Sequence, residues 1–98
     1  MKFLVIARIE DSFYALSPKK QAELWEAMTT VTDKLTKEGE YKAIYMQGNM
    51  KSLVLICDMK SSEDMARFAF ENPMFAFLDA ELTPLIDIDV VRKARRKK

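Results

Sequence analysis

The chain has 98 residues, of which 49% are hydrophobic and 32% charged, which is the composition of one globular domain and excludes a disordered or fibrous protein. It has no histidine and one cysteine, which excludes Ser-His-Asp and Cys-His catalytic systems, a structural zinc site and a histidine-ligated haem. Six of the 16 Lys and Arg residues lie in the last seven positions, which leaves 10 basic against 15 acidic residues, a balance of −5, in the rest.

Nothing in the sequence indicates export or membrane insertion. The apolar run from Phe3 to Ala7 is too short for a signal-peptide core or a membrane span. Cys57 cannot form an internal disulfide, which suits a reducing compartment. We therefore expect a cytoplasmic protein with no membrane partner.

The first half of the chain predicts a strand, a loop and a long helix. Lys2 to Ile9 is rich in Phe, Val and Ile, and both of its faces are apolar, which is typical of a strand buried on both sides. Glu10 to Leu16 reads as a loop. Ser17 and Pro18 form a helix start, and Gly39 supplies the stop.

The second half predicts two paired strands, a second helix and a last strand. Tyr41–Gln47 and Ser52–Asp58 alternate with period two and are joined by a short turn, so they form an antiparallel hairpin. Ser61 opens a second helix that Asn72-Pro73 ends. Met74 to Leu78 reads as a turn or short helical piece, and Ile86 to Val91 as the final strand, with Pro84 indicating a sheet edge or bulge there.

The order βαββαβ predicts an α+β, ferredoxin-like fold: a four-stranded antiparallel sheet with two helices on one face. We expect a single domain over residues 1–91 and a basic C-terminal tail over 92–98, which is solvated or, as the alternative, seeks an acidic partner. No basic face lies beside the tail, so we expect no nucleic-acid partner.

Two helices can cover only one face of this sheet, yet the first and third strands are apolar on both faces. A second copy of the sheet is the simplest cover for the other face. The pattern therefore predicts a homodimer or a higher homo-oligomer.

The second strand offers candidate site residues. In a regular strand Tyr41, Ala43 and Tyr45 share a face, and Ala43 leaves a gap between the two phenols. Trp25 and Thr32 share one flank of the first helix. These positions predict a small-molecule pocket between the sheet and the first helix, with Tyr41, Trp25 and Thr32 binding the substrate; the alternative is that both tyrosines are half-buried packing residues.

For chemistry in that pocket, Tyr45 is the candidate hydrogen-bond donor to a developing enolate, since a phenol stays protonated near neutral pH. Arg8 stands on an apolar strand face and is the second candidate catalytic residue, as a partner for a carboxylate or enolate. It can equally lie at the strand end with its head in water. No metal-ligand cluster is expected.

The segment Pro73–Leu82, PMFAFLDAEL, resembles the P-L-F-x-Y-M-D-x-E-V signature of bacterial muconolactone isomerases. Weaker matches at compatible spacing extend the resemblance over residues 2–85: Pro18, Lys20, Lys37-Glu38-Gly39, Gly48, Asp58, Ser61 and Glu63. The resemblance implies the dimeric α+β-barrel superfamily and an isomerase that moves a double bond in a lactone without a cofactor.

The site departs from that family more than the scaffold does. The first helix reads Met28-Thr29-Thr30 where the family has a carboxylate, and the second strand reads Tyr45-Met46 where it has an aromatic residue and an arginine. We therefore expect a cofactor-free isomerase or cyclase acting on a cyclic oxygenated substrate. The alternatives are a non-catalytic oligomeric small-molecule-binding protein and a cofactor-independent monooxygenase.

Overall fold

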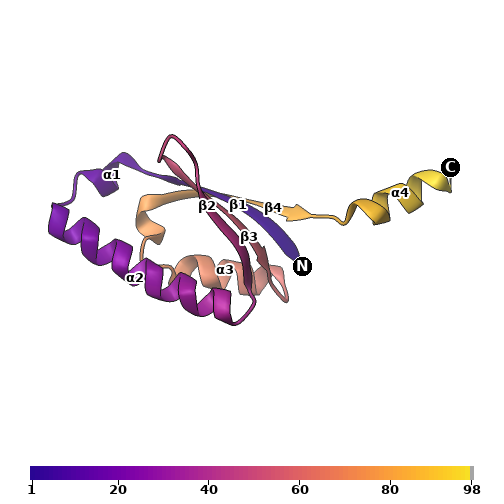
Figure 1. Cartoon of the computed structure of the whole chain (residues 1–98), viewed down its shortest axis with the longest axis horizontal. Coiled ribbons are helices and arrows are strands. Elements are labelled where there is room, and N and C mark those ends of the chain that lie inside the picture. The colour runs from indigo at the N-terminus through magenta and orange to yellow at the C-terminus, as the bar shows by residue number, and fades with distance from the viewer. Residues whose placement is uncertain (98) are drawn as a thin grey trace.

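The computed structural model describes residues Met1 to Lys97. Four strands form one antiparallel sheet in the order β2-β3-β1-β4: Tyr41–Met46, Ser52–Asp58, Lys2–Ile9 and Leu78–Leu85. The helices α2 (Pro18–Lys37) and α3 (Ser62–Glu71) lie on the same face of this sheet (Figure 1). The predicted ferredoxin-like arrangement is confirmed.

Both predicted helix starts form as the sequence indicates. The Ser17 hydroxyl accepts a hydrogen bond from the Lys20 backbone N–H at 3.2 Å, and the Ser61 hydroxyl accepts one from Asp64 at the same distance. At the end of α2, Gly39 adopts φ 80°, a left-handed conformation that favours glycine.

The fourth strand was predicted in the wrong place. β4 spans Leu78–Leu85, and the segment predicted as the strand Ile86–Val91 instead enters the helix α4 (Ile88–Arg96). The Asp87 carboxylate caps that helix by accepting a hydrogen bond from the Asp89 backbone N–H at 2.8 Å, so the Asp87/Asp89 alternation reflects a helix start. Pro84 does lie in an edge strand, where its missing N–H costs least.

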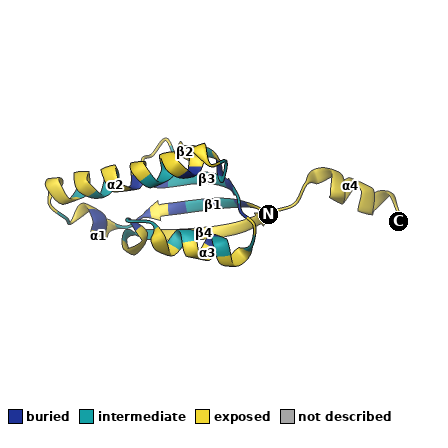
Figure 2. Cartoon of the chain, turned by 90° about the horizontal axis from the view of Figure 1, so that it is seen from below, coloured by how far each residue is buried: buried dark blue, intermediate teal, exposed yellow. Residues whose placement is uncertain are grey.

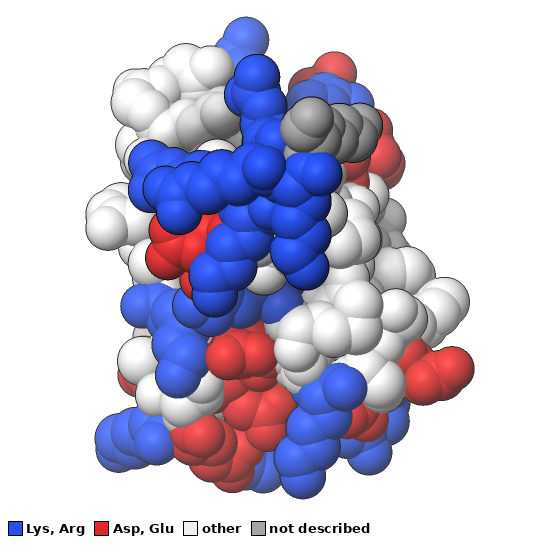
Figure 3. All heavy atoms as spheres, turned by 90° about the vertical axis from the view of Figure 1, so that its right-hand side faces the viewer, with Lys and Arg blue, Asp and Glu red and all other residues white. Residues whose placement is uncertain are grey.

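The basic residues at the end of the chain are helical through Arg96, so the expected boundary after residue 91 falls inside α4. Lys98 lies outside the described residues. The helix projects away from the sheet and gives the chain its longest dimension of 58 Å (Figure 1). Viewed from that end, Lys and Arg side chains gather on the projecting helix above a surface that is richer in acidic residues (Figure 3).

Two short elements complete the chain. The predicted loop after β1 contains the helix α1 (Asp11–Tyr14), held by Phe13, which is fully buried. The expected turn after α3 is a 3-10 helix, η1 (Phe75–Phe77). No helix of residues 1–97 is long and apolar enough to cross a membrane.

The buried residues form two separate clusters. Figure 2 shows that buried positions lie on the strands and along the helices that cover the sheet, whereas α4 is exposed throughout. One cluster, which we call the sulfur core, joins β1, β2, β3, the end of α2 and the first half of α3: Phe3, Val5, Leu35, Tyr41, Cys57, Met59 and Met65. The other, the aromatic core, lies under α1 and the start of α2: Ile9, Phe13, Met28 and Met74.

Candidate functional site

A cavity of about 250 Å³ lies between the inner face of the sheet and the helices α2 and α3. All four strands contribute aliphatic side chains to it, including Val5, Leu53, Leu55 and Leu82. Lining residues at its edges, Ile44, Phe75 and Leu82, are 40%, 40% and 38% exposed, so the cavity opens to solvent.

The cavity exists because small side chains stand between the two cores. Ala7 and Ala80 face each other across β1 and β4, and Ala69 lies opposite them on α3. Larger side chains at these places would fill the hollow, since protein interiors are otherwise tightly packed. The hollow is therefore encoded in the sequence by its alanines.

Three of the five predicted site residues line this cavity. Trp25 and Thr32 reach it from α2, and Tyr41 reaches it from β2. The Trp25 ring packs edge-on against Phe13, with ring centroids 5.9 Å apart, so the aromatic core fixes its position. The Thr32 hydroxyl donates to the Thr29 carbonyl oxygen at 3.0 Å, which leaves its oxygen lone pairs as acceptors.

Tyr41 is 6% exposed and belongs to the sulfur core. Burial raises the pKa of its phenol to about 12, with smaller contributions from Cys57 and Glu40. In residues 1–97 its hydroxyl has no hydrogen-bond partner, and it is not sealed from solvent. Tyr41 therefore offers a protonated donor and cannot act as a base near neutral pH.

Tyr45 is not in the cavity, which corrects the expectation that it shares a face with Tyr41. Tyr41 pairs with Cys57 but Ala43 pairs with Ile56, so Lys42 is an extra residue, a β-bulge, in β2. Because side chains alternate with period two, the bulge keeps Tyr41 on the inner face and turns Ala43 and Tyr45 to the outer face. Tyr45 is 65% exposed there.

Arg8 is likewise on the outer face, where it pairs in register with Asp79 on β4 and with Ser52 on β3. It lines a shallow surface hollow together with Asp79 and Glu81, and all three are exposed. The structure thus separates Arg8 and Tyr45 from the cavity and from the other three predicted residues.

Sequence reasoning missed Asn72, which lies at the end of α3 and lines the cavity. Its Oδ1 accepts a hydrogen bond from the Met74 backbone N–H at 2.8 Å, and within the described chain its Nδ2 donates to no group. The available signal was its place on the inner stripe of α3, where a polar residue follows Met65, Phe68 and Ala69.

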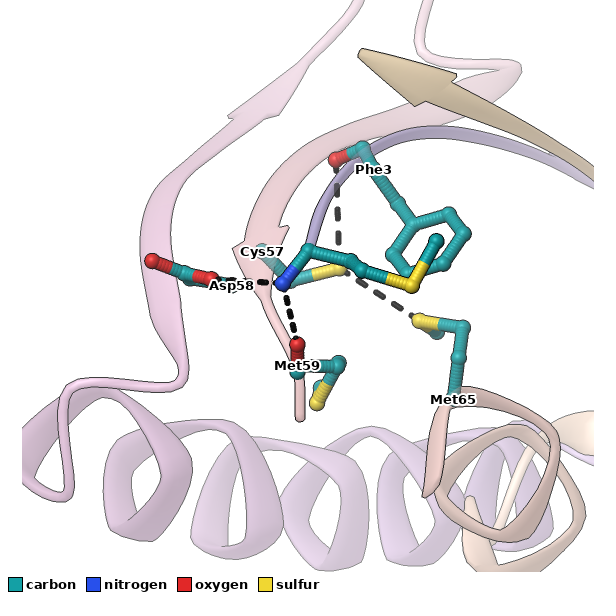
Figure 4. A network of polar contacts seen from close by, with 6 residues as sticks. Phe3, Cys57, Asp58, Met59 and Met65 are labelled. Atoms are coloured by element: carbon teal, nitrogen blue, oxygen red, sulfur yellow. Dashed lines mark hydrogen bonds and ion pairs between the residues drawn. The ribbon is translucent and has the colours of Figure 1, made fainter. Parts of the chain in front are cut away.

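Cys57 lies near the cavity but faces the sulfur core (Figure 4). Its Sγ is 3.5 Å from the Met65 Sδ and 3.9 Å from the Phe3 carbonyl oxygen, and burial raises the pKa of the thiol to about 11. A buried, protonated thiol is a poor nucleophile. Within residues 1–97, no cluster of three His, Cys, Asp or Glu side chains could hold a metal ion.

The cavity lining holds no ionised side chain: in the described residues it contains no Asp, Glu, Lys or Arg. Its polar groups are neutral and are confined to Tyr41, Trp25, Thr29, Thr32 and Asn72. Such a site can orient a ligand by hydrogen bonds and can polarise an oxygen atom, but it supplies no strong base.

The chain thus combines a four-stranded ferredoxin-like sheet with a hollow beneath two helices. Among solved structures, the chain is similar to a crystal structure of muconolactone isomerase, with a TM-score of 0.78 and 20% sequence identity over 89% of this chain and 90% of that one. The chain therefore has the fold of that protein. No protein-family model and no curated protein sequence matches it.

Proposed function

We propose that this chain binds a small, cyclic, oxygenated molecule in the cavity between its sheet and the helices α2 and α3. The observation that supports this is the hollow itself, which opens to solvent and has Tyr41, Trp25 and Asn72 among its apolar walls. An apolar cavity with a few polar groups is the usual form of a ligand site.

The lining favours binding over catalysis. A proton transfer beside a carbonyl needs a base of tuned pKa, and the described cavity walls provide none. The fold shared with muconolactone isomerase supports a cofactor-free isomerase or cyclase as the second candidate. In that case Tyr41, and not Tyr45, is the donor that would stabilise a developing enolate.

A saturable quench of Trp25 fluorescence tests the binding proposal, because Trp25 is the single tryptophan and lines the cavity. We expect 1,4-naphthoquinone to quench it with a saturable isotherm. Ala69→Phe, which fills the cavity, should abolish saturation, whereas Ala66→Phe on the exposed side of the same helix should not. Equal binding by both variants would contradict the proposal.

Turnover is tested separately with an unsaturated γ-lactone followed by NMR. If the chain moves the double bond, Tyr41→Phe should slow the reaction on the order of 10²-fold, as removal of one oxyanion donor does. A binding protein would show no double-bond shift and only a loss of affinity in the same variant.

We also propose that two copies pair through the outer faces of their sheets. Leu4, Ile6, Val54 and Ile56 form an apolar patch across β1 and β3, and in the single chain each is only half-buried. A second sheet packed at about 10 Å would remove these side chains from water. Tyr45 is exposed beside Val54 on this face, and aromatic residues are enriched in protein interfaces.

A further inference from the structure

The charge of the cavity walls restricts what can bind there. Placing an ionised carboxylate or ammonium in an apolar cavity without a partner is strongly unfavourable. Arg67 is a charged residue close to the cavity: its guanidinium lies 5.3 Å from the ring centre of Phe68, a lining residue. That guanidinium is already paired with the Asp64 carboxylate at 3.4 Å and does not line the cavity.

The neutral polar groups in the walls are mostly donors. Asn72 uses its Oδ1 to hold the Met74 backbone, which leaves the two Nδ2 hydrogens for a ligand. The Tyr41 hydroxyl and the Trp25 indole N–H also have no partner within residues 1–97. The hydroxyls of Thr29 and Thr32 both donate to backbone carbonyl oxygens of α2, and Thr29 donates to the Trp25 carbonyl at 2.8 Å.

From these two observations, and resting on the proposed binding function, we infer that the cavity selects uncharged ring compounds that bear a carbonyl-type acceptor oxygen and rejects their carboxylate-bearing counterparts. The apolar walls contact the ring, and the oxygen accepts a hydrogen bond from Tyr41 or from Asn72. No group in the described walls compensates the desolvation of an anion.

The test compares coumarin, an uncharged fused-ring lactone with acceptor oxygens only, with coumarin-3-carboxylate, by calorimetry at pH 7. We expect the intact chain to bind coumarin at least about tenfold more tightly, since an unpaired carboxylate at the open side of the cavity keeps part of its hydration. Asn72→Asp keeps the oxygen that holds the Met74 backbone but removes the donors, and it should weaken coumarin binding about tenfold.

A matched pair of variants tests the charge argument directly. Thr29 lines the cavity and its neighbour Thr30 does not, although both are exposed threonines on α2. Thr29→Lys should bring a cation to the cavity and reduce the ratio of the affinity for coumarin to that for coumarin-3-carboxylate about tenfold. Thr30→Lys, which adds the same net charge, should leave this ratio unchanged.

The outcomes separate this inference from the function on which it rests. If the carboxylate binds as tightly as coumarin and Ala69→Phe abolishes both, the charge selection is wrong and the cavity is still a ligand site. If Asn72→Asp and Tyr41→Phe leave coumarin binding intact, the acceptor-oxygen part is wrong. If neither compound binds at millimolar concentration, both the inference and the proposed binding function are contradicted.

Discussion

The two faces of β1 have similar sequences and different surroundings. On the inner face Phe3 and Val5 are 4% and 6% exposed under the helices, whereas Leu4 and Ile6 on the outer face are only half-buried. The hydrophobicity of the strand therefore does not predict which of its two faces the helices of the same chain cover. The proposed second copy would cover the apolar face that the chain leaves open, and each of the following predictions tests this contrast between the two faces.

The largest expected effect is on the inner face. Phe3→Ala should lower the free energy of unfolding by about 3–5 kcal/mol, because it removes a buried ring and leaves a void in the sulfur core. Leu4→Ala, one position along, should lower it by about 1 kcal/mol in the monomer, since its side chain is half-exposed there. Urea unfolding at low protein concentration measures the free energy of unfolding of both variants. Equal decreases in the two variants would contradict the difference between the inner and the outer face.

On the outer face, Ile56→Asp should abolish assembly and leave the monomer folded. In a sheet-on-sheet dimer the new carboxylate would be buried without a partner, at a cost of several kcal/mol. Light scattering should show the mass fall from twice 11.4 kDa to 11.4 kDa with an unchanged circular dichroism spectrum. Thr30→Asp on exposed α2 is the control, and a wild-type mass of 11.4 kDa would end the dimer proposal.

Two buried titratable groups on the inner face of the sheet, Cys57 and Tyr41, should make the protein less stable at alkaline pH. Burial raises the pKa of Cys57 from 9.0 to about 11 and that of Tyr41 from 10.0 to about 12. Below pH 9 both groups are protonated in the folded and unfolded chain; above it the unfolded chain releases protons first, so the free energy of unfolding falls between about pH 9 and 12. The double variant Cys57→Ala, Tyr41→Phe should show a shallower fall, and an identical slope would contradict the assignment.

The smallest effect is expected at the C-terminus. Deleting residues 92–98 should leave the melting temperature and the assembly state unchanged, because the side chains of the described part of this segment are exposed. Differential scanning calorimetry and light scattering check this. A clear fall in either would show that the basic part of α4 docks on another copy.

The sequence predicted most of the scaffold because its signals are local. The Ser17-Pro18 start, the Gly39 stop and the period-two strands depend on backbone chemistry within a few residues. The fourth strand was misplaced because two neighbouring segments both alternate: Leu78 to Leu85 and Ile86 to Val91. Pairing with β1 selects the first, and the Asp87 cap turns the second into a helix.

The candidate site was predicted only in part. Helix periodicity predicted that Trp25 and Thr32 share one flank of α2, and these two residues and Tyr41 line the cavity; their role in binding stays a prediction. Tyr45 could not be placed, since the bulge at Lys42 is defined by pairing with β3, which sequence spacing alone does not show. Asn72 was seen as a helix end, and only the folded chain shows that its amide also faces a hollow.

The bulge at Lys42 decides which side chains of β2 face the cavity. If the strand ran straight through the same residues, Ala43 and Tyr45 would turn inward and Ile44 would turn outward. The cavity would then exchange an aliphatic wall for a second phenol, with no amino acid replaced. An insertion or deletion of one residue in this strand would therefore change the polarity of the cavity walls in a single step.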